Sequence, residues 1–402
     1  MSKPKIRFKG YEEDWEQRKL SDITLKIGSG KTPSGGKNAY VDDGIPLIRS
    51  QNINNDRVDL EDIVFIDEET DNSMENSRVF TDDVLLNITG ASIGRSAVYR
   101  GKDKANVNQH VCIIRPTKDF DSDFIQLNLA SNFGQKQIDA SQAGGGREGL
   151  NFQEIGKMSF MFPSNQEQMK IGVYFNHIDY LITLHQRKCE ETKKLKKYML
   201  QKMFPQNGKR VPEIRFVGFT EDWEQRKVKE FAIESEVKGH SGKDAKKLTV
   251  KLHNKGVYVA DEKIQGSDNT QYYIRRAGQF IYGKQNFFNG AIGIVPKKLD
   301  KYESTKDVPA FDVSSDVNVD WLYYYIARPE IYKPQEALCT GTGSKRFHVN
   351  NFYNLSLAIP KMDEQIKIKE YFVHLDNLIT LHQRKYEELQ KIKKFMLQNM
   401  FI

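Results

Sequence analysis

The feature that most constrains this chain is an internal duplication. The block PKIRFKGYEEDWEQRK at residues 4–19 returns as PEIRFVGFTEDWEQRK at residues 212–227, 208 positions later. A second block, residues 163–204, returns as residues 360–401, now 197 positions later, and the letters LITLHQRK are identical in both copies. Chance does not produce two such blocks in the same order. The chain is therefore a duplication, and its fold must accommodate two copies of one frame.

The segments between the repeated blocks differ from each other. Residues 20–160 and 228–357 match poorly, and the change of offset makes the first segment about eleven residues longer. A constant frame with divergent inserts indicates one architecture that presents two distinct recognition surfaces.

The second block predicts a long helix in each copy. From residue 167 to residue 204 there is no proline, and Gly172 is the only glycine. About 38 residues at 1.5 Å each give a helix on the order of 57 Å long. Apolar or semi-apolar positions recur at steps of mostly four and three, which is the pattern of a coiled-coil seam. These positions are Ile178, Ile182, His185, Cys189, Thr192, Leu195 and Met199 in the first copy, and Leu375, Ile379, His382, Tyr386, Leu389, Ile392 and Met396 in the second.

A helix of this length cannot bury its apolar stripe alone. We expect the two helices to pack against each other as an antiparallel coiled coil; the alternative, in which each helix packs on its own domain, stays open. The polar linker at residues 205–212 ends the first helix, and its continuation (the PEIRF block) has no counterpart after the second helix. The counterpart is the N-terminal block, residues 1–19. We therefore expect that block to pack near the end of the second helix, in a cyclic, pseudo-two-fold arrangement.

Both inserts have the pattern of mixed, strand-rich domains, which makes the fold class α+β. Each insert also has one predicted helix and a glycine-bearing loop, and it returns to the frame through an apolar strand ending in Pro163 or Pro360. Strands are predicted at residues 45–53, 83–89, 111–115, 279–282 and 291–295, helices at 124–137 and 321–331, and loops at 144–149 and 340–346.

Composition excludes several classes of protein. No apolar run approaches the roughly 18–20 residues of a membrane span, and the charged N-terminus is unlike a signal peptide. The three cysteines, Cys112, Cys189 and Cys339, lie far apart and include no CxxC pair. This pattern fits a reducing cytoplasm and gives no support for a zinc site or a disulfide. The net charge of +7 is compatible with nucleic-acid binding, although many other proteins share it.

Several polar segments of the inserts have side chains suited to DNA. Glycine lets a backbone approach a phosphate, Arg and Lys pair with phosphates or guanine, and Asn and Gln suit adenine. An ordinary solvated surface is the alternative for each segment. The candidates are Lys31, Ser34, Lys37, Arg49, Gln51, Asn52, Thr89, Asn108, Gln109, His110 and Arg147 in the first insert, and Lys243, Lys284, Gln285, Asn286, Lys345 and Arg346 in the second.

Motifs for catalysis or metal binding are absent from the sequence. Residues 28–32 (GSGKT) resemble the end of a phosphate-binding loop, but the glycine required at position 25 is Leu25. The histidines have no HExxH spacing, and no methyltransferase motif of the Asn-Pro-Pro-Tyr type or nuclease carboxylate cluster is present. We therefore expect no catalytic residue, no metal and no cofactor in this chain, so a DNA-directed activity would need a partner.

Taken together, these motifs resemble the specificity subunits of type I restriction–modification systems. The marks are GIPLIR at residues 44–49, TGASIG at 89–94, VNQH at 107–110, the Pro-x-x-x-Glu-Gln entries at 163–168 and 360–365, and the helix ends KYMLQKMF and KFMLQNMF. The second insert departs from the pattern, since it has GAIG at residues 290–293 without the Thr-Gly and lacks a clear Asn-Gln-His. Its DNA contacts are less defined for that reason.

The resemblance implies two target-recognition domains that alternate with two conserved helices. The divisions expected are 1–163 and 213–360 for these domains, 164–204 and 361–402 for the helices, and 205–212 for the linker. Each domain would recognise one half of an interrupted, asymmetric DNA target, with half-sites roughly 10 bp apart. The seam residues Ile178, Ile182, His185, Leu195, Met199, Leu375, Ile379, His382, Leu389 and Met396 would form the coiled coil and the surface that partners dock on.

The resemblance also implies partners. Two modification subunits would bind S-adenosylmethionine and methylate adenine, and two restriction subunits would use ATP and Mg²⁺ in a bacterial or archaeal cytoplasm. Two alternatives from other classes remain: a divergent single-chain DNA methyltransferase, and a coiled-coil scaffold with no role on DNA.

Overall fold

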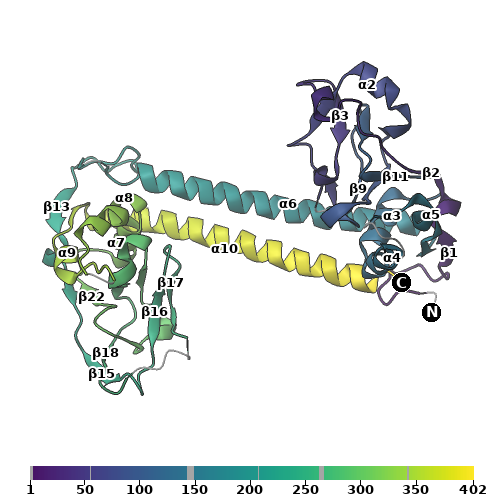
Figure 1. The fold of residues 1–402 in the computed structure, drawn as a ribbon. Helices are drawn as coiled ribbons and strands as arrows, with labels where there is room; N and C mark the ends of the chain where they lie inside the picture. Colours follow the sequence, from purple (N-terminus) through teal and green to yellow (C-terminus); the bar gives the residue numbers. More distant parts are fainter. Residues whose placement is uncertain (1–2, 55, 143–148, 207, 262–266, 342–343) are drawn as a thin grey trace. The chain divides into compact units, whose positions relative to one another are not determined.

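The computed structural model describes residues 3–402 except 55, 143–148, 207, 262–266 and 342–343 (Figure 1). The chain forms two compact units: unit 1 is residues 1–185 with 384–402, and unit 2 is residues 186–383. Two helices of 38 residues, α6 (Asn165–Lys202) and α10 (Met362–Asn399), each pass from one unit into the other. Each unit therefore contains part of both helices, whereas the sequence divisions treat each helix as a separate part. Among the described residues, no helix is long and apolar enough to cross a membrane.

Unit 1 is built on a four-stranded antiparallel sheet in the order β2-β11-β8-β9. Leu86, Ile114 and Phe124 are fully buried in the core formed by this sheet and the helices against it. The strands are β2 (Thr24–Ser29), β8 (Val84–Asn87), β9 (Ser96–Val98) and β11 (Val111–Pro116), and the helices are α1 (Leu20–Ile23), α3 (Ser122–Ala130), α4 (Asn132–Gln142) and α5 (Phe152–Lys157).

Unit 2 contains the same sheet, in the order β14-β22-β19-β20 and again antiparallel. The register between the two inner strands repeats that of unit 1, because Ile114 lies opposite Val84 and Phe311 lies opposite Phe280. The two inserts thus share a sheet although their sequences match poorly. The strands are β14 (Ala232–Glu234), β19 (Phe280–Tyr282), β20 (Ile292–Ile294) and β22 (Ala310–Val313), with helices α7 (Val319–Ile326), α8 (Pro329–Tyr332) and α9 (Val349–Tyr353) nearby.

The units differ most in the segment between β2 and β8 in unit 1 and in the corresponding segment between β14 and β19 in unit 2. The extra residues of unit 1 are located there. Unit 1 forms a second sheet, β6-β3-β10-β7, and a hairpin, β4-β5; unit 2 forms a three-stranded sheet, β15-β18-β21, and a hairpin, β16-β17. The elements of unit 1 are β3 (Ile45–Ile48), β4 (Ile53–Asn54), β5 (Arg57–Val58), β6 (Val64–Ile66), α2 (Glu68–Ser73), β7 (Arg78–Val79) and β10 (Ala105–Val107). Those of unit 2 are β15 (Lys238–Ser241), β16 (Leu248–Lys251), β17 (Gly256–Val259), β18 (Gln271–Ile274) and β21 (Glu303–Ser304).

The expectation of one helix in each insert is wrong, because each predicted helix is interrupted. In unit 1, Ser131 is extended between α3 and α4, and its Oγ both donates to Asn128 O (2.7 Å) and accepts from Gly134 N (3.1 Å). This side chain satisfies groups at the end of one helix and the start of the next. In unit 2, Arg328 is extended before Pro329, whose ring favours the first turn of a new helix over continuation of the old one.

The repeated frame forms the same contacts in both units. β1 (Glu16–Lys19) pairs with β12 (Ser159–Phe162), and β13 (Glu224–Lys227) pairs with β23 (Ser356–Ile359). Arg7 donates two hydrogen bonds of 2.8 Å to the buried Glu167, and Arg215 donates two, of 2.6 and 2.8 Å, to the buried Glu364. These glutamates belong to the Pro-x-x-x-Glu-Gln entries of the two long helices.

The N-terminal block closes unit 1 in the way that the linker closes unit 2. Ile6 N donates to Asn399 O (3.0 Å) at the end of α10, and Ile214 N donates to Lys202 O (2.9 Å) at the end of α6. The expected packing of the N-terminal block near the end of the second helix is confirmed.

Within each unit the two helix segments run antiparallel. In unit 1, Phe175 faces Phe401 with ring centroids 6.0 Å apart, and Asp179 pairs with Lys393 further along. In unit 2, the Cys189 thiol lies 3.9 Å from Ile379 O, and Lys196 pairs with Asp376. As the residue number increases along α6, the number of the contacting residue on α10 decreases. The seam residues predicted from sequence are buried or half-buried here, with two exceptions, Leu195 and Ile392. Those that fit the pattern include Ile178, Ile182, His185, Met199, Leu375, Ile379, His382, Leu389 and Met396.

The first exception is Leu195, whose assignment to the seam is wrong. Leu195 is 45% exposed, and Lys196 takes the half-buried position beside it. The strict alternation of four and three residues places position 196, not 195, after Thr192. Ile392 and Lys393 show the same relation in the second copy.

Candidate nucleic-acid interface

Three segments that are distant in sequence meet at one point in unit 1. Ile88, directly after β8, donates its N–H to His110 O (3.0 Å), which directly precedes β11. Leu150, which follows the glycine-bearing loop, donates its N–H to Ile88 O (2.9 Å). The structure thus brings together the TGASIG turn, the VNQH segment and the end of the 144–149 loop.

The same meeting of segments occurs in unit 2. Lys284 N donates to Asp307 O (2.8 Å), and Phe347 N donates to Lys284 O (2.8 Å). Lys284, Asp307 and Phe347 therefore occupy the places of Ile88, His110 and Leu150. We call each meeting the three-segment crossing of its unit. The chain presents one backbone arrangement twice, with different side chains on it.

Polar side chains link the segments at the crossing of unit 1. Thr89 Oγ1 lies 2.6 Å from His110 Nδ1, and Gln109 Nε2 lies 3.1 Å from His110 Nε2. The exposed Gln109 also accepts a hydrogen bond from Thr32, and Asn108 Oδ1 accepts from His110 N (3.1 Å). A hydrogen-bonded set of amide, imidazole and hydroxyl groups is suited to hydrogen bonding with base edges.

The segment after β3 lies beside this crossing, because Asn87 Nδ2 donates to Ser50 O (2.8 Å). Arg49 donates to Asp62 O (2.8 Å), and the exposed Gln51 donates to Asp62 Oδ2 (2.6 Å). Asn52 is wrong as a DNA contact: it is 2% exposed, and its Nδ2 holds the loop by donating to two carbonyls, of Asp59 and Asp62 (3.1 Å each).

The loop between β2 and β3 begins against β10. A Cβ at Gly30 would lie 1.7 Å from Val107 O, so glycine is required for this close approach. Lys31, Ser34 and Lys37 are exposed along the loop. Arg147 lies outside the described residues.

Basic side chains replace the amide and imidazole groups at the crossing of unit 2. Arg346 Nε lies 3.1 Å from Asp307 Oδ1, and burial lowers the pKa of the half-buried Lys284. Lys345 pairs with Glu336 (3.0 Å), and Asn286 Oδ1 accepts from Asn289 Nδ2 (3.1 Å). Gln285 is exposed next to Lys284, whereas Lys243 is exposed on the turn after β15.

Sequence reasoning missed two features of unit 2. Asp307, the partner of Arg346, lies in a segment with no Asn-Gln-His motif. His240 is 66% exposed at its side chain, and its Nδ1 lies 2.6 Å from Oε1 of Glu303, which is 2% exposed. The concentration of lysine and histidine between residues 238 and 255 was a signal for the second feature, but nothing in the sequence pairs position 240 with 303.

The comparisons with known proteins agree with this geometry. The family model of the type I restriction modification DNA specificity domain matches the chain twice, over residues 12–194 and 220–391. The chain belongs to this family. Each match contains one complete three-segment crossing, so each specificity domain of the chain has one.

Relatives extend over nearly the whole chain. The MjaVIII specificity subunit of a type I restriction enzyme from Methanocaldococcus jannaschii is 22% identical over 405 residues, which cover 95% of this chain and 91% of the relative. The EcoBI specificity subunit from Escherichia coli is 31% identical over 163 residues, 40% of this chain and 34% of the relative. The crystal structure of a type I S subunit from M. genitalium has the same fold, with a TM-score of 0.61, 12% identity and coverage of 100% of this chain and 99% of that one.

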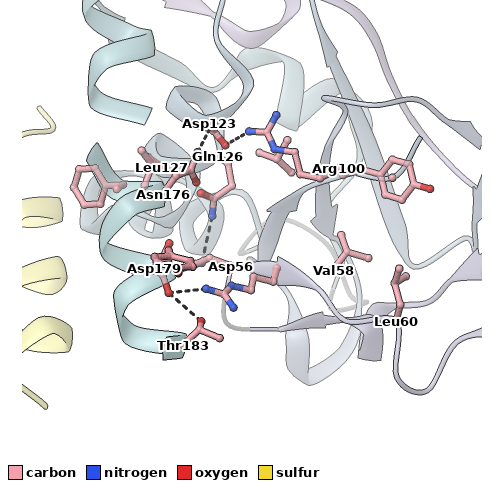
Figure 2. A pocket seen from close by; sticks show the side chains of 16 residues that line it. Asp56, Val58, Leu60, Arg100, Asp123, Gln126, Leu127, Asn176, Asp179 and Thr183 are labelled. Carbon is pink, nitrogen blue, oxygen red and sulfur yellow. Dashed lines mark hydrogen bonds and ion pairs between the residues drawn. The ribbon is translucent and has the colours of Figure 1, made fainter. Parts of the chain in front are cut away.

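A cavity of about 550 Å³ in the first specificity domain lies apart from the crossing residues. Figure 2 shows that its polar side chains face one another: Arg100 pairs with Asp123, and Gln126 Nε2 donates to Asp56 Oδ1 (3.2 Å). Asp179 O accepts from Thr183 Oγ1 (2.9 Å) in the same wall. None of the DNA-contact candidates that the structure describes lines it. The part of the chain that the structure describes holds no group of three His, Cys, Asp or Glu side chains arranged for a metal.

Proposed function

We propose that the chain is the DNA-recognition subunit of a type I restriction–modification complex, in which each three-segment crossing recognises one half of a bipartite, asymmetric target. The observation that supports this is the pair of crossings: identical backbone hydrogen bonds at Ile88 and at Lys284, with different side chains around them. Two half-sites of different sequence require two domains that approach DNA with the same backbone arrangement but present different side chains to it.

The side chains at each crossing suggest different contacts. Gln109, beside His110 and Thr89, offers an amide suited to adenine, and Arg346 with Lys284 offers donors suited to guanine or phosphate. Each half-site contact of this kind is worth about 1–3 kcal/mol of discrimination.

The helices are proposed to set the spacing of the half-sites and to dock the partners. Unit 2 exposes Leu195 and Tyr198 on α6, and unit 1 exposes their equivalents, Ile392 and Phe395, on α10. Two equivalent apolar patches fit two copies of one partner, which we propose is the modification subunit carrying S-adenosylmethionine. Two restriction subunits with ATP and Mg²⁺ would complete the complex in the cytoplasm.

Methylation mapping tests this proposal. Genomes of a host expressing the modification subunit are sequenced with and without this chain, and an interrupted motif that depends on the chain is expected. Gln109→Ala should alter one half of the motif and Arg346→Ala the other half. A single continuous motif, or a motif unchanged by both variants, would contradict the proposal. Methyl transfer by the purified chain alone would instead support the single-chain methyltransferase.

A further inference from the structure

The segment in which the two units differ also differs in charge. Residues 30–83 of unit 1 include 5 Lys or Arg and 13 Asp or Glu, a net charge of −8. The corresponding residues 235–279 of unit 2 include 9 and 5, a net charge of +4. DNA attracts a positive surface through its phosphates and repels a negative one. This difference in charge favours stronger contacts with the DNA backbone from the segment of unit 2 than from that of unit 1.

The positive charge of unit 2 is concentrated on the turn that follows β15. His240 ends the exposed part of that strand, and Lys243 and Lys246 are exposed on the turn. Within the described residues, neither lysine makes a salt bridge with an acidic side chain. Side chains that are unpaired within the protein can pair with a phosphate at no cost in lost ion pairs.

A buried carboxylate holds this turn in place. Glu303 on β21 accepts from His240 N (2.7 Å) with Oε2, and its Oε1 lies 2.6 Å from His240 Nδ1. Glu303 N also donates to Lys246 O (2.7 Å). A Cβ at Gly239 would lie 2.2 Å from Glu303 Oε2, so the backbone closes directly over the carboxylate. The imidazole is therefore oriented by its Nδ1, which leaves Nε2 as the nitrogen available to a ligand.

The described residues of unit 1 contain no equivalent of this arrangement. The repeat places Asn106 at the position of Glu303, and Asn106 is buried and donates to Asp71. No histidine lies among residues 30–83 of unit 1. The histidine–carboxylate pair is thus specific to the second domain.

We propose that His240, Lys243 and Lys246 form a phosphate-binding turn, through which the second domain supplies the larger salt-dependent share of DNA binding. The proposal rests on the proposed function, since it assigns the backbone contacts of one of its two domains. Glu303 is a positioning residue in this arrangement, and it lies four positions before Asp307 of the crossing.

The hydrogen bond that His240 donates to Glu303 raises the pKa of His240, and Asp244 acts in the same direction while Lys246 opposes it. Protonated His240 is the form that attracts a phosphate. Binding should therefore be strongest at low pH and should weaken as the pH rises through the raised pKa of His240.

The test is DNA binding by the full chain, measured by fluorescence anisotropy on a labelled duplex of mixed sequence and on one carrying the mapped target. Lys243→Gln and Lys246→Gln should each lower the slope of log K against log salt by about 1. His240→Gln should remove the fall in affinity that accompanies rising pH, because the variant has no imidazole to lose its proton. His177→Gln, at an exposed histidine of α6 in unit 1, should leave that fall in place.

The matched control for the lysines is Lys104→Gln, which should leave the slope unchanged. Lys104 is an exposed lysine of unit 1 that directly precedes β10, whereas His110 follows that strand. Unchanged slopes in both lysine variants, or an unchanged pH profile in His240→Gln, would overturn the inference. Failure of the proposed function is a separate result, in which the wild-type chain with its modification subunit shows no preference for the target duplex over the mixed one.

Discussion

Lys393 Nζ on α10 lies 2.6 Å from Asp179 Oδ1 on α6. The repeat-equivalent residues of unit 2, Lys196 and Asp376, lie 2.5 Å apart. The lysine of each pair occupies a seam position, where a hydrophobic residue would ordinarily pack. A polar pair at such a position fixes the register of two helices, because any shift leaves partly buried charges unpaired.

The third partner differs between the units. Lys393 also contacts Asp56 Oδ2 (2.8 Å), which lies just before β5, whereas Asp376 Oδ2 accepts from Tyr324 OH (2.7 Å) on α7. In unit 1 the seam lysine therefore also contacts the loop before β5, whereas in unit 2 the aspartate of the pair contacts helix α7.

Replacing Lys393 should destabilise unit 1 more than replacing Lys196 destabilises unit 2. Lys393→Met leaves Asp179 and Asp56 without their cation, and we expect a loss of about 3 kcal/mol in the free energy of unfolding. Lys196→Met should cost about 1 kcal/mol, because Asp376 is more exposed and keeps Tyr324. Urea denaturation measures both. Equal losses would show that the third partners are irrelevant.

The loss in Lys393→Met should depend on pH. Burial already raises the pKa of Asp179, and Lys393 opposes that shift. Without the lysine, the folded-state pKa rises further above the unfolded value, so the folded state retains a proton that the unfolded state has lost. The stability of the variant should therefore fall, relative to wild type, as the pH rises through the folded-state pKa of Asp179. Urea denaturation at a series of pH values tests this, and a constant difference would contradict it.

The two buried arginine–glutamate pairs should be needed for the frame. Glu364→Gln removes the charge that Arg215 contacts with two nitrogens, and we expect a loss of about 3 kcal/mol. Glu167→Gln should act likewise through Arg7. The control is Glu221→Gln, whose pairing with Lys361 is exposed on both sides and should change stability by less than about 0.5 kcal/mol. Thermal unfolding that fails to separate the buried pairs from this exposed one would refute the prediction.

Thr89 should matter to specificity without contacting a base. Thr89→Val removes the hydroxyl that lies 2.6 Å from His110 Nδ1 and leaves Gln109 as the side chain that still holds the imidazole. Discrimination at the half-site of unit 1 should fall by about 1–3 kcal/mol, with the other half unaffected. Binding to duplexes with single-base changes in each half measures this. Ser92→Ala, in the same turn, serves as the control and should leave discrimination intact.

Lengthening both helices should change the spacing tolerated between half-sites. Seven residues inserted after Gln186 and after Gln383 preserve the heptad seam and add about 10 Å to each helix. At about 3.4 Å per base pair along one strand, the preferred gap should grow by about 3 bp. Methylation mapping should then return the same two halves with a longer gap; an unchanged gap would exclude the helices as the spacer.

The sequence by itself determined the duplication, the two long helices and the packing of the N-terminal block at the end of α10. These depend on the local periodicity of apolar residues and on the sequence identity between the two copies, and both can be detected without a structure. The same reasoning found the TGASIG and VNQH segments, because short contiguous motifs can be identified from the sequence without knowledge of the fold.

Only the tertiary structure decided how the inserts are related and which side chains face outward. The shared sheet, the crossings at Ile88 and Lys284, and the Glu303 carboxylate beneath His240 all depend on hydrogen bonds between segments distant in sequence. Asn52 has the residue type of a base contact, yet two carbonyls seven and ten positions away bury it. The residue type determines which groups a side chain can bind. The packing of the folded chain determines whether those groups belong to the protein or to the DNA.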